Sequence, residues 1–382
     1  MEASRQTTWD PRRPARGFLR SLAGLGWPVF RTVMQTRIHA AWALAALAPL
    51  LCWVPGQGPA FPPGGPAQPF QGDLPLGLER ALPEPADNAF DPRRWELGRR
   101  LFFDAELSAD RTISCSSCHL PQRNFADGVA LSLGVRGQRT LRNAPSLVNR
   151  GFGASFMWDG RVATLEEQVL MPVANELEMG LPLDELVRRL AAHAEYPALF
   201  EAAFEDGLTQ QNAARALAQY VRRLVLGDSA IDRFRAGAYA ELSGEERVGL
   251  WVFESKGRCW RCHAGANFSD ELFHNTGVGA RQGLPEPGRM AITGEQGDRG
   301  RFKTPTLRGV AHTAPFMHDG SLATLSEVVA FYQRGGGANA SLDPLLQPLE
   351  LSERETAALV AFLEALSRPG GSPLAESGAG PR

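Results

Sequence analysis

Two Cys-x-x-Cys-His motifs constrain this chain more than any other feature of its sequence. Residues 115–119 read CSSCH and residues 259–263 read CWRCH. In this spacing the two thiols can form thioethers with the vinyl groups of a haem, while the adjacent histidine ligates the iron. Half a zinc site or a redox cysteine pair shares the spacing, but zinc needs further Cys or His ligands nearby and both motifs end in His. We therefore predict two covalently bound c-type haems, held by Cys115, Cys118, His119, Cys259, Cys262 and His263.

The overall composition is that of a globular protein without the excess of basic residues that would attract a polyanion. The 382 residues are 43% hydrophobic, enough to bury cores for two or three domains. Forty basic and 42 acidic residues leave a formal net charge of −2. Because nucleic-acid binding requires a basic surface, nucleic acid is not expected as a partner.

An apolar run near the N-terminus predicts export. Haem attachment of this type takes place outside the bacterial cytoplasm, and residues 40–54 are apolar and uncharged. The run is shorter than the roughly 20 residues that a transmembrane helix needs. Arg31 and Arg37 precede it, and the small residues of Gly58–Ala60 can supply a cleavage site. These features favour a signal peptide over a membrane anchor and predict a periplasmic protein with no stable membrane span.

The first residues do not resemble a signal peptide. Met34 would start one of ordinary length that keeps Arg37, so we expect residues 1–33 to precede the true start. Cys52 is the one cysteine outside the motifs. It can be interpreted as a lipid-modification site, although Leu51 before it is bulkier than such a site usually has.

Composition and helix signals divide the chain into segments. Residues 55–75 are rich in Pro and Gly and predict a linker, while residues 367–382 predict a disordered tail. A helix is expected to begin at Asp91-Pro92, with Asp91 as N-cap and with Leu97 and Leu101 on one face. We expect an N-terminal extension and signal peptide over 1–60, a linker over 61–89, haem domains over 90–228 and 229–367, and a tail over 368–382.

The two halves carry an internal repeat. A proline leads by 13 residues to Trp158 in the first half and to His318 in the second. Two Thr-x-x-Glu pairs in the same register predict capping boxes that begin equivalent helices. The matched segments are Asn143–Pro145 with Thr304–Pro305, Trp158–Gly160 with His318–Gly320, Thr164–Glu167 with Thr324–Glu327, and Ala216–Tyr220 with Ala358–Phe362.

The second half is longer because of an insertion. His119 precedes its repeat proline by 26 residues, whereas His263 precedes Pro305 by 42. Residues 275–300 supply the difference and are dense in Gly and Pro, without a helical period. Strand patterns are scarce in both halves. The predicted fold is all-α, with two cytochrome c-like haem domains side by side, long loops and little strand.

The repeat also predicts what faces each iron on the side opposite its histidine. A helix that begins at Thr164 places Gln168 and Pro172 on one face, and the equivalent helix in the second half places Val328 and Tyr332 there. Proline cannot ligate iron, whereas a tyrosine phenolate can. The first haem is therefore predicted to be open and the second closed.

An open haem can bind peroxide, whose cleavage calls for a proton shuttle worth about 10²–10⁴ in rate. Glu178 follows Gln168 by ten residues, where Pro172 is expected to end the helix and turn the chain. Glu178 is the candidate for this shuttle. From its position alone, a loop carboxylate in water is an equal interpretation.

Several long segments resemble one known family. The stretches GRRLFFDAELS, RNAPSLVNRGFGASFMWDGRVATLEEQVLMPVANELEMG and FKTPTLRGVAHTAPFMHDGSLATLSEVVAFYQRGG lie in consistent order around the haem motifs. Together they resemble the bacterial dihaem cytochrome c peroxidase and MauG superfamily, over about residues 90–366. The resemblance implies that the N-terminal haem is peroxidatic, with Gln168 and Glu178 lining its distal pocket. It implies that Trp158 relays electrons between the haems; a core aromatic is the alternative.

The resemblance further implies a calcium ion between the haems. The ion would be bound by the side chain of Asn143 and by the backbone carbonyls of Thr313 and Pro315, and oxygen ligands suit calcium.

Two departures separate the chain from conventional members of the family. Those members place a histidine on the peroxidatic iron, from the segment before the Asn-x-Pro motif, but here the next histidine after His119 is His193. They also have methionine where this chain has Tyr332, and tyrosine is the MauG pattern. An anionic ligand lowers the reduction potential of haem iron. Alternatively, Tyr332 is a core residue and Met317 or His318 ligates the iron.

The sequence therefore predicts an oxidoreductase that reduces hydrogen peroxide at the first haem. Electrons would come through the second haem from a small periplasmic cytochrome or copper protein. Two alternatives remain open: MauG-like oxidation of a tryptophan or tyrosine on a partner protein, and a dihaem electron carrier without catalysis. A homodimer is also compatible with the sequence.

Overall fold

Helices dominate the part of the chain that a computed structural model describes, which is residues 61–78, 81–280 and 283–371. The α-helices are α1 (Pro92–Phe103), α2 (Cys115–Cys118), α3 (Leu165–Gln168), α4 (Met171–Ala174), α5 (Leu183–Ala191), α6 (Tyr196–Ala203), α7 (Gln210–Arg222), α8 (Ala230–Arg235), α9 (Gly244–Glu254), α10 (Met290–Thr293), α11 (Leu325–Gln333) and α12 (Glu353–Ala365). Strands β1 (Phe273–His274) and β2 (Phe302–Lys303) form one short antiparallel pair. The expected helical fold with little strand is confirmed.

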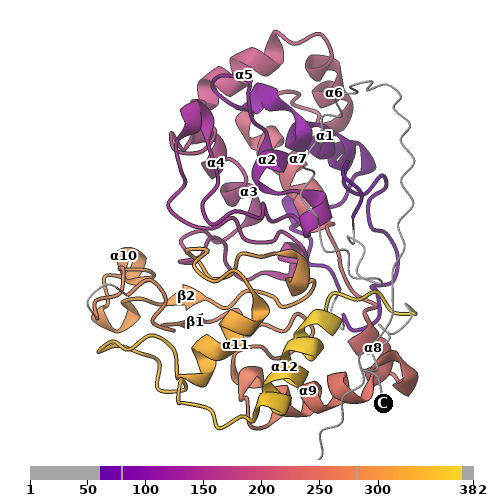
Figure 1. Cartoon of the computed structure of the whole chain (residues 1–382). Coiled ribbons are helices and arrows are strands. Elements are labelled where there is room, and N and C mark those ends of the chain that lie inside the picture. Colours follow the sequence, from indigo (N-terminus) through magenta and orange to yellow (C-terminus); the bar gives the residue numbers. More distant parts are fainter. Residues whose placement is uncertain (1–60, 79–80, 281–282, 372–382) are drawn as a thin grey trace, which may run out of the picture. The chain divides into compact units, whose positions relative to one another are not determined.

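The first half is built on the crossing of α1 and α7 (Figure 1). Helix α1 begins as predicted, with the Asp91 carboxylate accepting a hydrogen bond from Arg93 N at 2.7 Å and with Pro92 in the first turn. Leu97 and Leu101 are fully buried on its inner face. The helices touch at Gly98, where a Cβ atom would overlap the carbonyl oxygen of Ala216. Burial of these apolar side chains is the main force that holds the two helices together.

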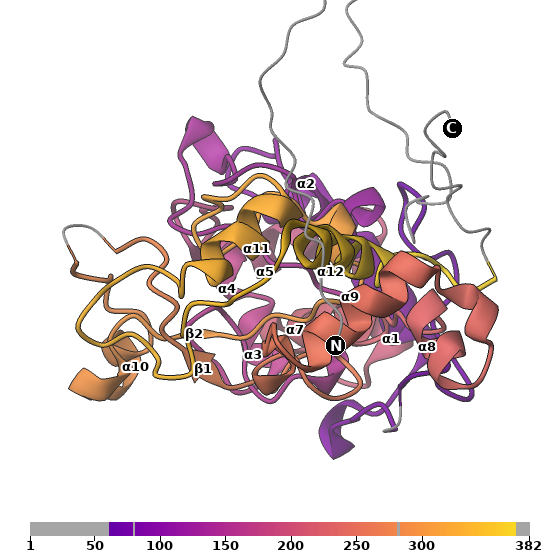
Figure 2. The same ribbon diagram turned by 60° about the horizontal axis from the view of Figure 1, so that its bottom comes forward.

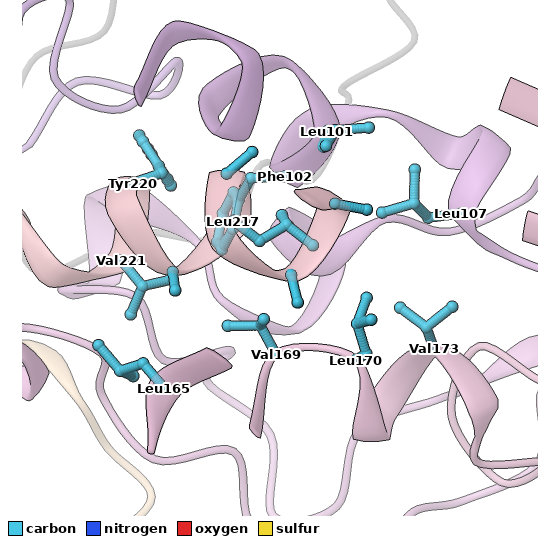
Figure 3. Close-up of a cluster of buried hydrophobic side chains, with 14 of the residues drawn as sticks. Leu101, Phe102, Leu107, Leu165, Val169, Leu170, Val173, Leu217, Tyr220 and Val221 are labelled. Atoms are coloured by element: carbon cyan, nitrogen blue, oxygen red, sulfur yellow. The ribbon is translucent and has the colours of Figure 1, made fainter. Parts of the chain in front are cut away.

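Helix α3 packs against the other side of α7, and α4 follows beside α3. Figure 3 shows the apolar side chains of the 165–173 segment turned toward those of α7. All of the labelled side chains are buried: Leu101, Phe102, Leu107, Leu165, Val169, Leu170, Val173, Leu217, Tyr220 and Val221. Because one face of α3 packs into this core, the opposite face of the helix points away from the core.

The second half repeats the same crossing with α9 and α12, which lie side by side in Figures 1 and 2. Here Gly249 takes the place of Gly98, because a Cβ atom at Gly249 would overlap the carbonyl oxygen of Ala358. Ala216 and Ala358 are the positions that the sequence repeat pairs. A second cluster of buried side chains, from Ala230 to Leu366, surrounds this crossing.

The turn that carries Trp158 and His318 is also repeated. Phe156 N donates to Val162 O at 2.8 Å, and Phe316 N donates to Leu322 O at 2.7 Å. Met157 and Met317 both have positive φ, 66° and 75° respectively. Positive φ is rare for such residues, so its recurrence shows that the two turns share one backbone conformation.

The structure corrects three details of the sequence prediction near helix ends. Pro172 does not end a helix: the chain stays helical through Val169 and Leu170, and Pro172 lies in the first turn of α4. Proline is tolerated there because the first-turn N–H groups have no partner within the helix. Of the two Thr-x-x-Glu pairs, only Thr324–Glu327 forms a complete capping box, because Glu167 accepts from Ala163 N and not from Thr164 N. The described part of the insertion contains a short α-helix, α10, and a 3₁₀ turn at Gln296–Asp298.

The predicted linker and tail are packed where they are described. Phe61 and Leu78 are buried, and Arg223 and Arg308 donate to the carbonyl oxygens of Phe70 and Gly77. The tail prediction is wrong for residues 368–371, because Arg368 is buried and binds Glu246. The predicted signal peptide, with Met34 and Cys52, lies outside the described residues, as does the rest of the tail. None of the helices within residues 61–78, 81–280 and 283–371 has the length and apolar character that crossing a membrane requires.

Candidate functional site

One cavity of about 700 Å³ brings together the two Cys-x-x-Cys-His motifs and most of the predicted site residues. Its size lies in the range of cofactor and ligand sites. The predicted residues that line it are Cys118, His119, Asn143, Trp158, Gln168, Glu178, Cys259, Cys262, His263, Thr313, Pro315 and Tyr332. Segments more than 200 residues apart in the sequence thus form one site.

The two motifs have closely similar local geometry. His119 N donates to Cys115 O at 3.0 Å, and His263 N donates to Cys259 O at 2.9 Å. The Nδ1 atom of His119 is bound to Phe125 O at 2.8 Å, and that of His263 to Phe268 O at 2.9 Å. A carbonyl partner fixes Nδ1 as the protonated nitrogen, which leaves Nε2 as the metal-binding atom. All four motif cysteines are free.

These features fit covalently attached haem. Burial lowers the pKa of both His119 and His263, so both rings are neutral, which is the form that ligates a metal. The free cysteine pairs are available for thioether bonds. Zinc would need further ligands at each motif, and the cavity offers His119 and His263 no such set within the described residues.

The first site is lined by Gln168, Pro172 and Glu178. The Glu178 carboxylate accepts a hydrogen bond from Asn175 Nδ2 at 2.7 Å, and Asn175 Oδ1 accepts from Leu177 N at 3.1 Å. Burial raises the pKa of Glu178, and the Asn175 hydrogen bond opposes that shift. Asn175 was missed in the sequence, where the NELEMG stretch indicated only a turn.

The second site places Tyr332 and Val328 at the corresponding positions of α11. Burial raises the pKa of Tyr332, so the phenol keeps its proton unless a cation lies against the oxygen. His318, an alternative ligand, is held elsewhere: its Nε2 atom is 2.7 Å from Glu286 Oε1 and its ring stacks on Phe302. Met317 lines the cavity in a positive-φ turn.

Trp158 lies at the cavity wall with fixed partners. Its Nε1 donates to Asn143 O at 2.9 Å, and its ring is 6.3 Å from the ring of His318 in an edge-to-face arrangement. Asn143 N in turn donates to His318 O at 2.9 Å. Trp158 and His318, which the repeat makes equivalent, therefore contact each other.

The three residues predicted to bind calcium lie along the same cavity. Asn143 is buried, and its Nδ2 donates to Val129 O at 2.9 Å and to Ala130 O at 3.3 Å. Because the nitrogen is used in this way, the side-chain oxygen Oδ1 is the atom that remains to accept a ligand. The hydroxyl of Thr313 donates to Val310 O at 2.9 Å.

A group of cations at the cavity was not predicted, because single arginines and lysines carry no distinctive pattern. Asp159 binds both Arg142 and Arg161, at 2.7 and 2.8 Å, and Glu271 binds Arg150 and Lys303, at 2.7 and 3.2 Å. Burial lowers the pKa of Lys303 to about 8. All four cations line the cavity. They suit the propionate groups that a haem carries.

His274, in strand β1, is held by two carboxylates. Its Nδ1 is 2.6 Å from Asp343 Oδ2 and its Nε2 is 3.0 Å from Asp270 Oδ2. Cys262 lies close to Asp270 and His274, and these three side chains are near enough to one another to resemble a metal site. Since Cys262 belongs to the second CWRCH motif, its sulfur is assigned to haem attachment.

Comparison with known proteins places the chain in a family. The family described as Di-haem cytochrome c peroxidase matches residues 92–240. The chain is 34% identical over 340 residues to the methylamine utilization protein MauG of Methylorubrum extorquens, which covers 88% of this chain and 96% of that protein. It is 38% identical to the cytochrome-c peroxidase IdrP2 of Denitromonas iodatirespirans, over 77% of this chain and 86% of that protein.

A solved structure supports the same placement. The crystal structure of a MauG-like protein associated with microbial copper homeostasis is 35% identical, with a TM-score of 0.71, and covers 78% of this chain and 95% of that one. The repeated haem motifs, the shared cavity and these relatives agree. The chain belongs to the di-haem cytochrome c peroxidase family.

Proposed function

We propose that this protein reduces hydrogen peroxide to water at the His119 haem, with electrons that pass from a periplasmic donor protein through the His263 haem. The reaction consumes one peroxide, two electrons and two protons and yields two waters. The observation that carries the proposal is the difference between two equivalent positions on the cavity wall, Pro172 in the first half and Tyr332 in the second.

Each half of the described chain would form one haem domain, over residues 90–228 and 229–367. Thioethers would form at Cys115 and Cys118 in the first and at Cys259 and Cys262 in the second, with His119 and His263 as iron ligands. When bound, haem supplies an iron centre that takes up peroxide and exchanges electrons.

Glu178 supplies the proton transfer at the first site. Peroxide cleavage would require a proton to move from one peroxide oxygen to the other, and a half-buried carboxylate that Asn175 orients suits this role. The raised pKa brings Glu178 closer to neutral pH, where a group that both takes and gives a proton works best. The amide of Gln168, on the same wall, would orient the substrate by hydrogen bonding.

Proline at position 172 would leave the iron on this side open, because proline offers no ligand atom. At the second site the Tyr332 oxygen would ligate the iron. Tyr332 would hold the iron as a phenolate, the form that burial alone disfavours and that a cation against the oxygen would stabilise. Trp158 would then relay electrons between the two sites, from the position where Asn143 and His318 hold it.

A calcium ion bound by Asn143, Thr313 and Pro315 completes the proposed centre. Asn143 contacts both Trp158 and His318 through its backbone, so an ion there would tie the relay to the loop that carries Pro315. Oxygen-only ligation suits calcium. We do not propose a homodimer, because no described surface argues for one.

The alternative product is an oxidised tryptophan or tyrosine on a partner protein. Tyr332 favours this second candidate, because an anionic ligand lowers the potential of the second haem and suits it to hold an oxidising equivalent. The two candidates share the peroxide site and differ in the reductant, a donor cytochrome or copper protein in one and a partner side chain in the other.

Electron paramagnetic resonance of the oxidised holoprotein tests the open site. The proposal requires one high-spin ferric haem and one low-spin ferric haem at neutral pH. Two low-spin signals would overturn it and favour a dihaem electron carrier without catalysis. Steady-state turnover with reduced cytochrome c and peroxide then separates the candidates. A turnover rate that stays at background, whether or not the protein has first been reduced, would count against peroxide detoxification.

A further inference from the structure

The insertion in the second half delivers a carboxylate to the cavity between the two haem motifs. Residues 275–300 have no counterpart in the first half. Asn275 anchors the start of the insertion by donating to Arg299 O at 3.1 Å and to Ser341 O at 2.9 Å. Between these ends Glu286 lines the cavity.

Glu286 binds two residues outside its own loop. Its Oε1 lies 2.7 Å from His318 Nε2, and its Oε2 lies 3.5 Å from Arg142 Nη2. The His318 side chain is 4% exposed and that of Glu286 is 37% exposed. The partner at His318 lowers the pKa of Glu286, which keeps this group a carboxylate.

The His318 ring is fixed on three sides by these contacts. Glu286 holds its Nε2, Phe302 stacks on its face with ring centres 3.6 Å apart, and Trp158 meets it edge-to-face at 6.3 Å. Arg142 also lies over Phe302, 4.9 Å from the ring centre. Because Arg142 binds both Glu286 and Asp159, the residue after Trp158, Glu286 is connected to Trp158 through Arg142 as well as through His318.

We propose that Glu286 is a positioning residue that acts through His318 to hold Trp158 in the geometry and charge environment in which it passes electrons between the haem sites. The inference rests on the proposed relay role of Trp158.

In the relay step Trp158 loses one electron toward the first site and regains one from the second, so the residue undergoes no net change. Its Nε1–H donates to a carbonyl oxygen, which does not accept the proton, so the oxidised indole keeps its proton and is positive. A carboxylate one ring away stabilises that positive charge.

Single-turnover kinetics on the haem-loaded Glu286→Gln and Glu286→Ala proteins test this. After mixing with one equivalent of hydrogen peroxide, the absorbance of each haem is followed separately. We expect unchanged resting spectra and unchanged peroxide consumption at the first haem. Passage of the oxidising equivalent to the second haem should slow roughly tenfold in Glu286→Ala, and less in Glu286→Gln, which keeps a hydrogen bond. Glu295→Gln, an exposed carboxylate in the same insertion, is the matched control and should behave as wild type.

A second comparison separates this inference from the proposed function. In a Trp158→Phe background, Glu286→Ala should have no further effect on the inter-haem rate, since both act on one step. If Trp158→Phe alone leaves that rate unchanged, the relay proposal fails. If Trp158→Phe slows transfer but Glu286→Ala does not, or slows it equally in both backgrounds, the positioning role of Glu286 is wrong.

Discussion

The two halves share a backbone frame and differ in the side chains that face the cavity. Gly98 in α1 and Gly249 in α9 allow the same helix crossing, and Met157 and Met317 occupy the same strained turn position. At positions facing the cavity the residues diverge, as Pro172 and Tyr332 show. Apart from the insertion over residues 275–300, the chemical difference between the halves therefore comes from single side chains on a repeated frame, so each pair of equivalent residues offers a direct experiment.

The largest expected effect is the loss of peroxide turnover when Glu178, at the first site, is replaced. Glu178→Gln removes the carboxylate that we propose transfers protons, while keeping its size and its bond to Asn175. We expect the peroxide turnover number to fall by about 10²–10⁴-fold, with both haems still attached. Glu176→Gln is the matched control, because Glu176 is exposed two residues earlier in the same turn. Equal rates in the Glu178→Gln and wild-type proteins would remove Glu178 from the reaction.

The pH profile gives a second measurement on the same residue. Burial raises the pKa of Glu178 above its ordinary value, so the carboxylate that takes up the first proton is lost as pH falls through this raised pKa. Activity should therefore decline on the acid side at a higher pH than an ordinary glutamate predicts. The residual activity of Glu178→Gln should lack this acid limb; if it keeps the limb, another group titrates there.

The next largest expected effect is on the reduction potential of the second haem, when Tyr332 is replaced. If Tyr332 ligates the iron as proposed, Tyr332→Met replaces an anionic oxygen with a neutral sulfur and should raise the reduction potential of the second haem by on the order of 0.1 V or more. Redox titration followed by absorbance checks this. The first haem should keep its potential and its high-spin signal. Tyr239→Phe, at an exposed tyrosine in the same half, is the control; equal shifts at both haems would argue against direct ligation by Tyr332.

A smaller effect is expected at the helix crossings. Gly249→Ala should destabilise the protein by about 1–3 kcal/mol, because the added Cβ overlaps Ala358 O and the two helices must separate. Gly98→Ala should act alike in the first half. Gly244→Ala, in the same helix but with open space at the Cβ position, should be neutral or stabilising by roughly 0.4–1 kcal/mol. Urea unfolding of the holoproteins measures all three, and a stabilising Gly249→Ala would contradict the packing described here.

Local patterns made much of the fold predictable. The Asp91-Pro92 start of α1 and the capping box at Thr324 depend on neighbours within four residues, and both appear in the structure. Pro172 shows where local rules failed. A proline usually ends a helix, but here Val169 and Leu170 keep right-handed helical backbone angles and Pro172 lies in the first turn of α4.

The site was predictable only as far as the repeat and the family resemblance reached. These brought Gln168, Glu178 and Tyr332 to notice, and the structure places all three on one cavity, although their chemical roles stay predictions. The contact between Glu286 and His318 joins residues 32 apart across an irregular insertion. No periodicity relates them, so only the folded chain reveals that pair.

The smallest expected effect is on the melting temperature, and it tests whether the two equivalent helices, α3 and α11, begin with equally strong caps. Glu327 accepts hydrogen bonds from the backbone N–H groups of Ala323 and Thr324, at 2.6 and 3.0 Å, whereas Glu167 accepts one, from Ala163 at 3.3 Å. Glu327→Ala should therefore lower the melting temperature of the holoprotein more than Glu167→Ala does, by roughly 1–2 °C. Scanning calorimetry of both variants checks this. Since the Glu327 cap begins the helix that carries Tyr332, loosening it should also broaden the second haem's signal while leaving the first unchanged; a larger loss from Glu167→Ala would show that the two helix starts are held by something other than these caps.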